Sequence, residues 1–104
     1  MISHPSMLKH IEDSIVHKKM MNNKSGSVTF FAMDDFESIA EHKNRHNEYV
    51  YIMDGQIELV VNNKSLLLSK GDFYAIGANN IHTVKGKRCG KFALVILKNK
   101  KGCM

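Results

Sequence analysis

The most constraining feature of this sequence is a regular series of short strand-like segments from Val28 almost to the end of the chain. The segments share β-branched and aromatic residues, or an alternation of apolar and polar positions. They are residues 28–33, 48–53, 56–61, 65–68, 73–76, 81–84 and 92–97. Because no helical pattern separates them, the sequence predicts an all-β fold, an antiparallel sandwich or barrel.

Turn-forming residues divide these segments. They are residues 22–26, Asp34-Asp35, Asp54-Gly55, Asn62-Asn63, residues 70–72, residues 77–80 and residues 85–90. An Asp-Gly or Asn-Asn pair between two strand-like runs is typical of a hairpin. We therefore expect tight turns at Asp54-Gly55 and at Asn62-Asn63, and a further turn over residues 85–90.

With 104 residues, the chain has room for one domain. We expect residues 1–26 to form an N-terminal arm or edge strand that packs on a barrel of residues 27–104. The spacing of Met7, Ile11 and Ile15 also suits a short amphipathic helix, so helix and edge strand both remain open.

Charge and hydropathy exclude several classes of partner. The net charge is +5, but the basic residues are scattered and form no helical stripe, so no nucleic acid is expected. The long apolar run at residues 92–97 is far too short to span a bilayer, and no secretory signal is visible. We expect no membrane partner, a cytoplasmic location, and reduced thiols at Cys89 and Cys103.

Some of the strand-like segments are apolar on both faces, notably Phe30-Phe31 and residues 92–97. A single barrel would leave one of these faces in water, which is unfavourable for a large apolar patch. A second copy of the chain is the simplest cover. The sequence therefore predicts a homodimer.

Polar residues at even spacing precede one of the central segments. They are His42, Asn44, His46 and Glu48. If residues 42–48 form one extended strand, these side chains share the face of Val50 and Ile52, which we assign to the barrel interior. Glu48 would then be a carboxylate at the mouth of an apolar cavity, and a cation or a hydrogen-bonding ligand would offset the cost of burying it.

Two stretches resemble the conserved motifs of the cupin family. Residues 41–55 resemble the first motif, in which two histidines precede a glutamate and a glycine, here Glu48 and Gly55. Residues 71–82 resemble the second motif, which opens on Gly71-Asp72 and ends at His82. The resemblance covers about residues 27–97 and implies a cupin-type antiparallel β-barrel, the double-stranded β-helix or jelly roll.

The resemblance also implies a metal site. Cupins with complete motifs bind one divalent metal through three histidines and the glutamate, which suits Fe, Mn, Ni or Zn. His42, Glu48 and His82 match three of these ligands, whereas Asn44 occupies the position of the second histidine. His46 could replace it if the strand bulges. The stretch is also similar to small cupins for which a metal is not assured.

Two functions follow from this pattern, and the sequence leaves open whether the chain is an enzyme. The first is a metal-dependent cupin of the oxygenase, isomerase or lyase type that acts on a small polar or acidic molecule. The second is a metal-free cupin that binds or senses a small sugar or carboxylate. In both, we expect Glu48, His82, Asn44 and Tyr51 to contact the ligand.

Overall fold

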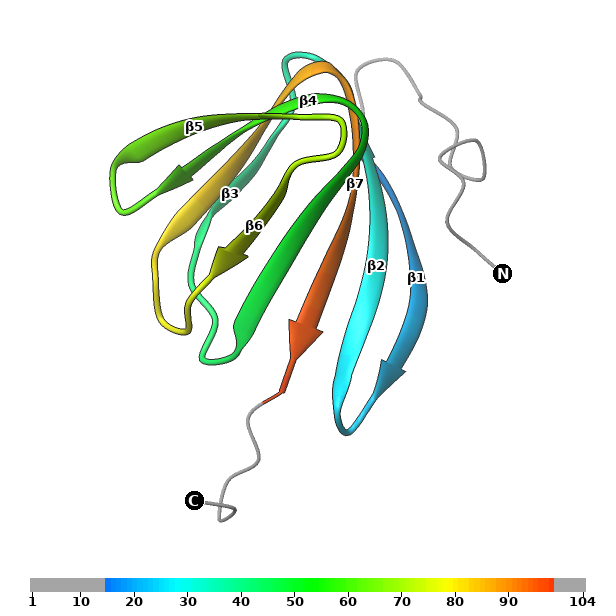
Figure 1. The fold of residues 1–104 in the computed structure, drawn as a ribbon, viewed down its shortest axis with the longest axis vertical. Coiled ribbons are helices and arrows are strands. Elements are labelled where there is room, and N and C mark those ends of the chain that lie inside the picture. Colours follow the sequence, from blue (N-terminus) through cyan, green and yellow to red (C-terminus); the bar gives the residue numbers. More distant parts are fainter. Residues whose placement is uncertain (1–14, 99–104) are drawn as a thin grey trace.

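The computed structural model describes residues 15–98, apart from the side chain of His42, and every regular element in this range is a strand (Figure 1). The strands are β1 (Ile15–Asn23), β2 (Gly26–Met33), β3 (Ser38–His42), β4 (Asn47–Val61), β5 (Lys64–Ser69), β6 (Phe73–Ile76) and β7 (His82–Leu97). All of their pairings are antiparallel. The predicted all-β fold is confirmed.

The long strands β4 and β7 organise the fold. They pair with each other along most of their length, and the sheet order is β1-β2-β7-β4-β5, with β3 on β7 and β6 on β4. β3 pairs with the first part of β7, whereas β2 pairs with its last part. The two halves of β4 and β7 therefore belong to two layers, which face each other across the core (Figure 1).

The bend in these long strands corrects two predicted turns. Asp54-Gly55 and residues 85–90 are not hairpin turns, because β4 and β7 run through them and remain paired. The register shifts around Asp54, which marks bulges that kink a strand pair. Gly55 has a φ of +67°, and a Cβ there would lie 1.9 Å from the carbonyl oxygen of Arg88. Glycine is therefore required at this corner.

Two other turn predictions are confirmed. Asn62 and Asn63 have φ values of 50° and 69° and connect β4 to β5. Two successive positive φ angles match the right-handed twist of a two-residue hairpin. Residues 70–72 form the turn into β6, with Gly71 at a φ of +93°.

The predicted interior face is also confirmed. Val50, Ile52, Ile57, Leu59 and Val61 are all buried in one core cluster. Residues from both layers complete this cluster, and they are Met33, Leu68, Ile76, Val84 and Phe92. The core therefore lies between the layers, and any side chain on the inner face of β4 or β7 points into it.

The edge strand β1 resolves the open question for residues 15–23. They form a strand that pairs with β2, so the helix interpretation is wrong for this segment. Met7 and Ile11 lie outside the described residues. On the outer face of this layer, Phe30 and Ala93 belong to a second, smaller buried cluster, as expected for strands that are apolar on both faces.

Candidate functional site

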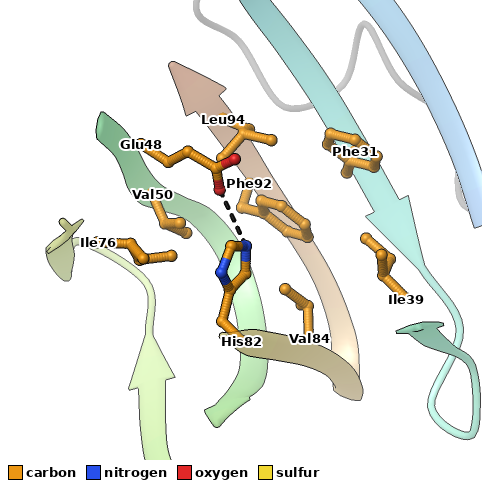
Figure 2. Close-up of a pocket in the computed structure, with 9 residues that line it drawn as sticks. All are labelled: Phe31, Ile39, Glu48, Val50, Ile76, His82, Val84, Phe92 and Leu94. Atoms are coloured by element: carbon orange, nitrogen blue, oxygen red, sulfur yellow. Dashed lines mark ion pairs between the residues drawn. The ribbon is translucent and has the colours of Figure 1, made fainter. Parts of the chain in front are cut away.

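Glu48 and His82 meet inside the barrel. Glu48 lies on the inner face of β4 with Val50, and His82 begins β7 on the inner face that it shares with Val84. Their exposed fractions are only 2 % and 3 %. Nε2 of His82 lies 3.0 Å from Oε1 of Glu48 (Figure 2). The structure thus brings these two sequence-predicted residues into direct contact.

The contacts of the His82 ring define where its protons are. Nδ1 lies 3.0 Å from the carbonyl oxygen of Asn80, and because a carbonyl only accepts, Nδ1 carries a hydrogen. The hydrogen bond to Glu48 is the main cause that raises the pKa of His82; the Asn80 carbonyl and the charge of Glu48 act in the same direction, and burial opposes them. Both ring nitrogens of His82 thus face oxygen atoms, and these contacts favour the protonated form of the ring.

Asn44 holds the other side of the carboxylate. Its Nδ2 donates to Oε2 of Glu48 at 3.0 Å, and its Oδ1 accepts the backbone N–H of His46 at 3.1 Å. Both ends of the Asn44 amide are therefore engaged. The carboxylate is fixed in place, with His82 at one oxygen and Asn44 at the other.

The loop between β3 and β4 contacts the loop between β6 and β7, and together they position Glu48 and His82. The backbone N–H of Asn79 donates to the carbonyl of Asn44 at 2.6 Å, and that of Ala78 donates to Oδ1 of Asn47 at 2.9 Å. The same loop supplies the Asn80 carbonyl to His82. Asn47 and Asn80 are not predicted from the sequence to be part of the site. Their only signal is that asparagine favours loops, which does not distinguish them from other turn residues.

A cavity of about 160 Å³ lies beside the pair. Apart from Glu48 and His82, the side chains that line it are all apolar. They are Phe31, Ile39, Val50, Ile76, Val84, Phe92 and Leu94 (Figure 2). The rings of Phe31 and Phe92 stack with centroids 5.0 Å apart and an interplanar angle of 7°. The site is therefore an apolar chamber with one polar corner.

The fold and its motifs match one protein family. The family model described as "Cupin domain" matches residues 29–95, well over half of the chain. The chain belongs to the cupin domain family. This match and the similar solved structures confirm the predicted jelly-roll barrel. A search of curated proteins finds no match.

Solved cupins and related structures share this fold at low sequence identity. A conserved protein of unknown function from Streptococcus pyogenes has a TM-score of 0.91 and 16% identity, with 97% of this chain and 89% of that chain covered. A cupin superfamily protein from Desulfitobacterium hafniense has a TM-score of 0.87 and 19% identity, with 91% of this chain and 87% of that chain covered. A cupin 2 conserved barrel domain protein from Leptotrichia buccalis has a TM-score of 0.87 and 24% identity, with 89% of this chain and 45% of that chain covered. These likenesses establish the fold alone.

The predicted metal ligands are only partly assembled among the described side chains of this cupin. Glu48 and His82 are together, but the described side chains of residues 15–98, which do not include that of His42, contain no group of three or more His, Cys, Asp or Glu that could hold a metal. Asn44 contributes no metal-facing oxygen, because its Oδ1 accepts from His46. The side chain of His42 lies outside the described part. Two ligands are fewer than a metal site requires, so the described residues do not by themselves fit one.

The loop before β4 explains why His46 does not join the pair. Residues 42–48 are not one extended strand, since β3 ends at His42 and β4 begins at Asn47. The even spacing therefore does not place His46 on the face of Glu48. Tyr51 lies on the outer face of β4, is 45% exposed, and is not among the residues that line the cavity.

No helix in the described part of the chain is long and apolar enough to cross a membrane.

Proposed function

We propose that this cupin binds a small, largely apolar molecule in the barrel cavity, with the Glu48–His82 pair meeting its polar group. The observation that supports this is a buried polar pair at one corner of an otherwise apolar chamber. Ligand sites of this kind combine an apolar wall with a few fixed polar groups that orient the ligand. The sequence led us to expect a polar or acidic molecule, and the apolar wall now favours a more hydrophobic one.

A binding role without catalysis fits the engagement of the polar groups. His82 uses both ring nitrogens, on Asn80 and Glu48, and Asn44 uses both ends of its amide. These contacts make the corner rigid in the absence of a ligand. Such preorganisation lowers the entropic cost of binding.

The cavity itself can be tested with toluene as an apolar probe. Val84 lines the cavity, and its neighbour Thr83 points to the opposite face of β7. We expect toluene to shift the amide NMR signals of cavity residues in the wild type and in Thr83→Phe, but not in Val84→Phe, where the larger ring fills the space. Folding of each variant is checked from its amide spectrum. Equal responses from both variants would place the binding site elsewhere.

A metal-dependent cupin is the second candidate, and one observation favours it. The backbone of His42 is the register partner of His82 in the β3–β7 ladder, and the Nδ1–H of His82 is held by a carbonyl, as in histidine ligands of metals. Glu48, His82 and His42 would hold a divalent ion there, which would supply Lewis-acid chemistry. About one Fe, Mn, Ni or Zn per chain in untagged protein, and much less in His82→Ala, would support this function.

We also propose that the outer face of the β4–β6 layer forms a homodimer. Tyr51 and Phe73 are 45% and 62% exposed there, and the rings of Tyr49 and Phe73 stack with centroids 5.9 Å apart. Large exposed aromatic groups are typical of protein interfaces. Light scattering should give a dimer mass for the wild type and for Leu67→Asp, which changes an exposed leucine of β5, and a monomer mass for Tyr51→Asp/Phe73→Asp.

A further inference from the structure

We propose that the molecule in the cavity carries a small anionic group of the carboxylate class, held beside the cavity by Lys19 of β1 and by the hydroxyls of Ser27 and Thr29 of β2. This inference rests on the proposed binding function and adds a charged group to the ligand. It concerns the inner face of β1 and β2 and uses no contact with the Glu48–His82 pair. Three observations support it: the strand register, two buried hydroxyls, and the charge of the two strands.

The strand register places Lys19 and Thr29 on the face that borders the cavity. Lys19 pairs with Thr29 across β1 and β2, and Thr29 pairs with Leu94 across β2 and β7. Side chains of directly paired residues lie on the same face of a sheet. Leu94 lines the cavity, as does Phe31, two residues after Thr29 on β2 (Figure 2). A group bound over Thr29 would therefore lie about one strand spacing, about 4.8 Å, from the cavity wall.

A ring contact supports the orientation of β1. The centroid of the His17 ring lies 6.0 Å from that of Phe31, so His17 is on the cavity side of its strand. Lys19 is two residues further along and shares this side, whereas Lys18 points to the opposite face. Both lysines are exposed. Only Lys19 therefore presents its charge beside the cavity.

Two buried hydroxyls lie on the inner face of β2. Ser27 and Thr29 are two residues apart and point to the same side, with exposed fractions of 7% and 8%. Neither hydroxyl has a hydrogen-bond partner among the described residues. Burying a hydroxyl without a partner costs free energy. A ligand group that accepts hydrogen bonds from these hydroxyls would offset this cost.

The charge of the two strands favours an anion. A lysine ammonium donates hydrogen bonds and accepts none, so its partner is an acceptor, and a negatively charged acceptor binds most strongly. β1 and β2 contain no Asp or Glu. Within residues 15–98, no carboxylate pairs with Lys19. A carboxylate has enough lone pairs to accept from the Lys19 ammonium and from the hydroxyls of β2 together.

The cavity and its distance from Thr29 define suitable probes. The cavity volume is about 160 Å³, and an engineered apolar cavity of about 150 Å³ in another protein holds benzene. Phenylpropionate supplies one ring for the cavity and a carboxylate at the end of a short, two-carbon linker. Phenylpropanamide has nearly the same shape without the charge, and toluene supplies the ring alone.

Calorimetric titrations with these three probes test the inference. In the wild type, we expect phenylpropionate to bind about tenfold more tightly than phenylpropanamide, as hydrogen bonds to a charged group provide. Lys19→Gln should remove this preference. Lys18→Gln is the matched control on the opposite face and should keep it. Thr29→Val, which replaces the hydroxyl by a methyl group, should weaken the binding of phenylpropionate and leave that of toluene unchanged.

The wild type and the two lysine variants decide the inference. Equal binding of phenylpropionate and phenylpropanamide to the wild type, or equal effects of Lys18→Gln and Lys19→Gln, would overturn it. If toluene still binds, the proposed function is unaffected by that result. Failure of all three probes to bind would instead refute the proposed function, and this inference with it.

Discussion

Asn44 donates from Nδ2 to Oε2 of Glu48 across 3.0 Å, and it does so from the position where the cupin motif carries its second histidine. A residue type that coordinates a metal in the motif is thus replaced by one that donates a hydrogen bond to the neighbouring carboxylate. The other carboxylate oxygen faces His82, so each oxygen of Glu48 contacts a described side chain.

The choice of inner face can be tested by burying a charge. Val50 is fully enclosed in the core, so Val50→Asp should lower the free energy of unfolding by several kcal/mol, roughly 3–5, because the new carboxylate has no partner there. Leu67 is 58% exposed on β5, and Leu67→Asp should cost about 0.5 kcal/mol or less. Urea denaturation measures both values. Similar effects of the two substitutions would contradict the assignment of Val50 to the interior.

The bend at Gly55 can be tested by comparing Gly55 with Gly71, because both glycines have a positive φ. A Cβ at Gly55 would collide with the carbonyl of Arg88, whereas nothing lies within 4 Å of a Cβ at Gly71. Gly55→Ala should therefore destabilise the protein by at least about 3 kcal/mol, from strain and a backbone clash together. Gly71→Ala should lower the free energy of unfolding by only about 1–2 kcal/mol, because the alanine must adopt a left-handed conformation but meets no other atoms. A smaller loss of melting temperature for Gly55→Ala than for Gly71→Ala would refute this account of the corner.

Two similar dipeptides, Asn62-Asn63 and Asp54-Gly55, show which parts of the fold could be predicted from the sequence. The hairpin at Asn62-Asn63 was predictable because its chemistry is local, with both residues tolerating positive φ. Asp54-Gly55 looks the same in sequence, but its role depends on β7, which stays paired with β4 through the bend. That pairing partner lies more than thirty residues away in the sequence, so no local pattern could distinguish a corner from a hairpin.

The candidate site was predictable to a similar degree. Strand alternation and the motif spacing were enough to predict that Glu48 and His82 point into the barrel. The orientation of Asn44 was not predictable, because it depends on a loop that pairs with Ala78 and Asn79. The even spacing of His42 through Glu48 was misleading, since it assumed a strand where the chain forms that loop.

Stability should depend on pH through His82. Its pKa is raised in the folded protein from its ordinary value of 6.5, mainly by the hydrogen bond to Glu48. The stabilisation is therefore fully present below about pH 6.5 and is lost as the pH rises through the folded-state pKa. Glu48→Gln replaces the carboxylate by a neutral amide, which weakens the hydrogen bond to His82 and removes the negative charge, so both contributions of Glu48 to the raised pKa are reduced. We expect the difference in unfolding free energy between wild type and Glu48→Gln to be larger near pH 6 than near pH 9.

Urea denaturation at several pH values measures this difference, and an NMR titration of the His82 ring gives the pKa directly. In Glu48→Gln, the pKa of His82 should be lower than in the wild type. A gap in stability that widens with rising pH would contradict the raised pKa of His82, because it would mean that the folded pair binds fewer protons than the unfolded chain.

One substitution, Asn44→His, should convert the Glu48–His82 site into a metal site. Asn44 is already in contact with Glu48, so Asn44→His should place an imidazole beside the carboxylate and raise the described ligands from two to three. Three such ligands with an open position are typical of zinc sites. We expect Asn44→His to bind about one Zn²⁺ per chain, at least tenfold more tightly than the wild type, in competition with a chromophoric chelator.

Two variants control for histidine content. Lys43→His adds an imidazole at an exposed neighbouring position, and Asn44→His/His82→Ala restores the number of ligands to two; neither should gain zinc affinity. If the wild type already binds one zinc as tightly as Asn44→His, an undescribed side chain completes the site, and the metal-dependent function replaces the metal-free one. If Asn44→His folds and gains no zinc affinity, its imidazole does not reach the position that the Asn44 amide occupies beside Glu48. The Asn44–Glu48 hydrogen bond would then not show where a third metal ligand has to lie.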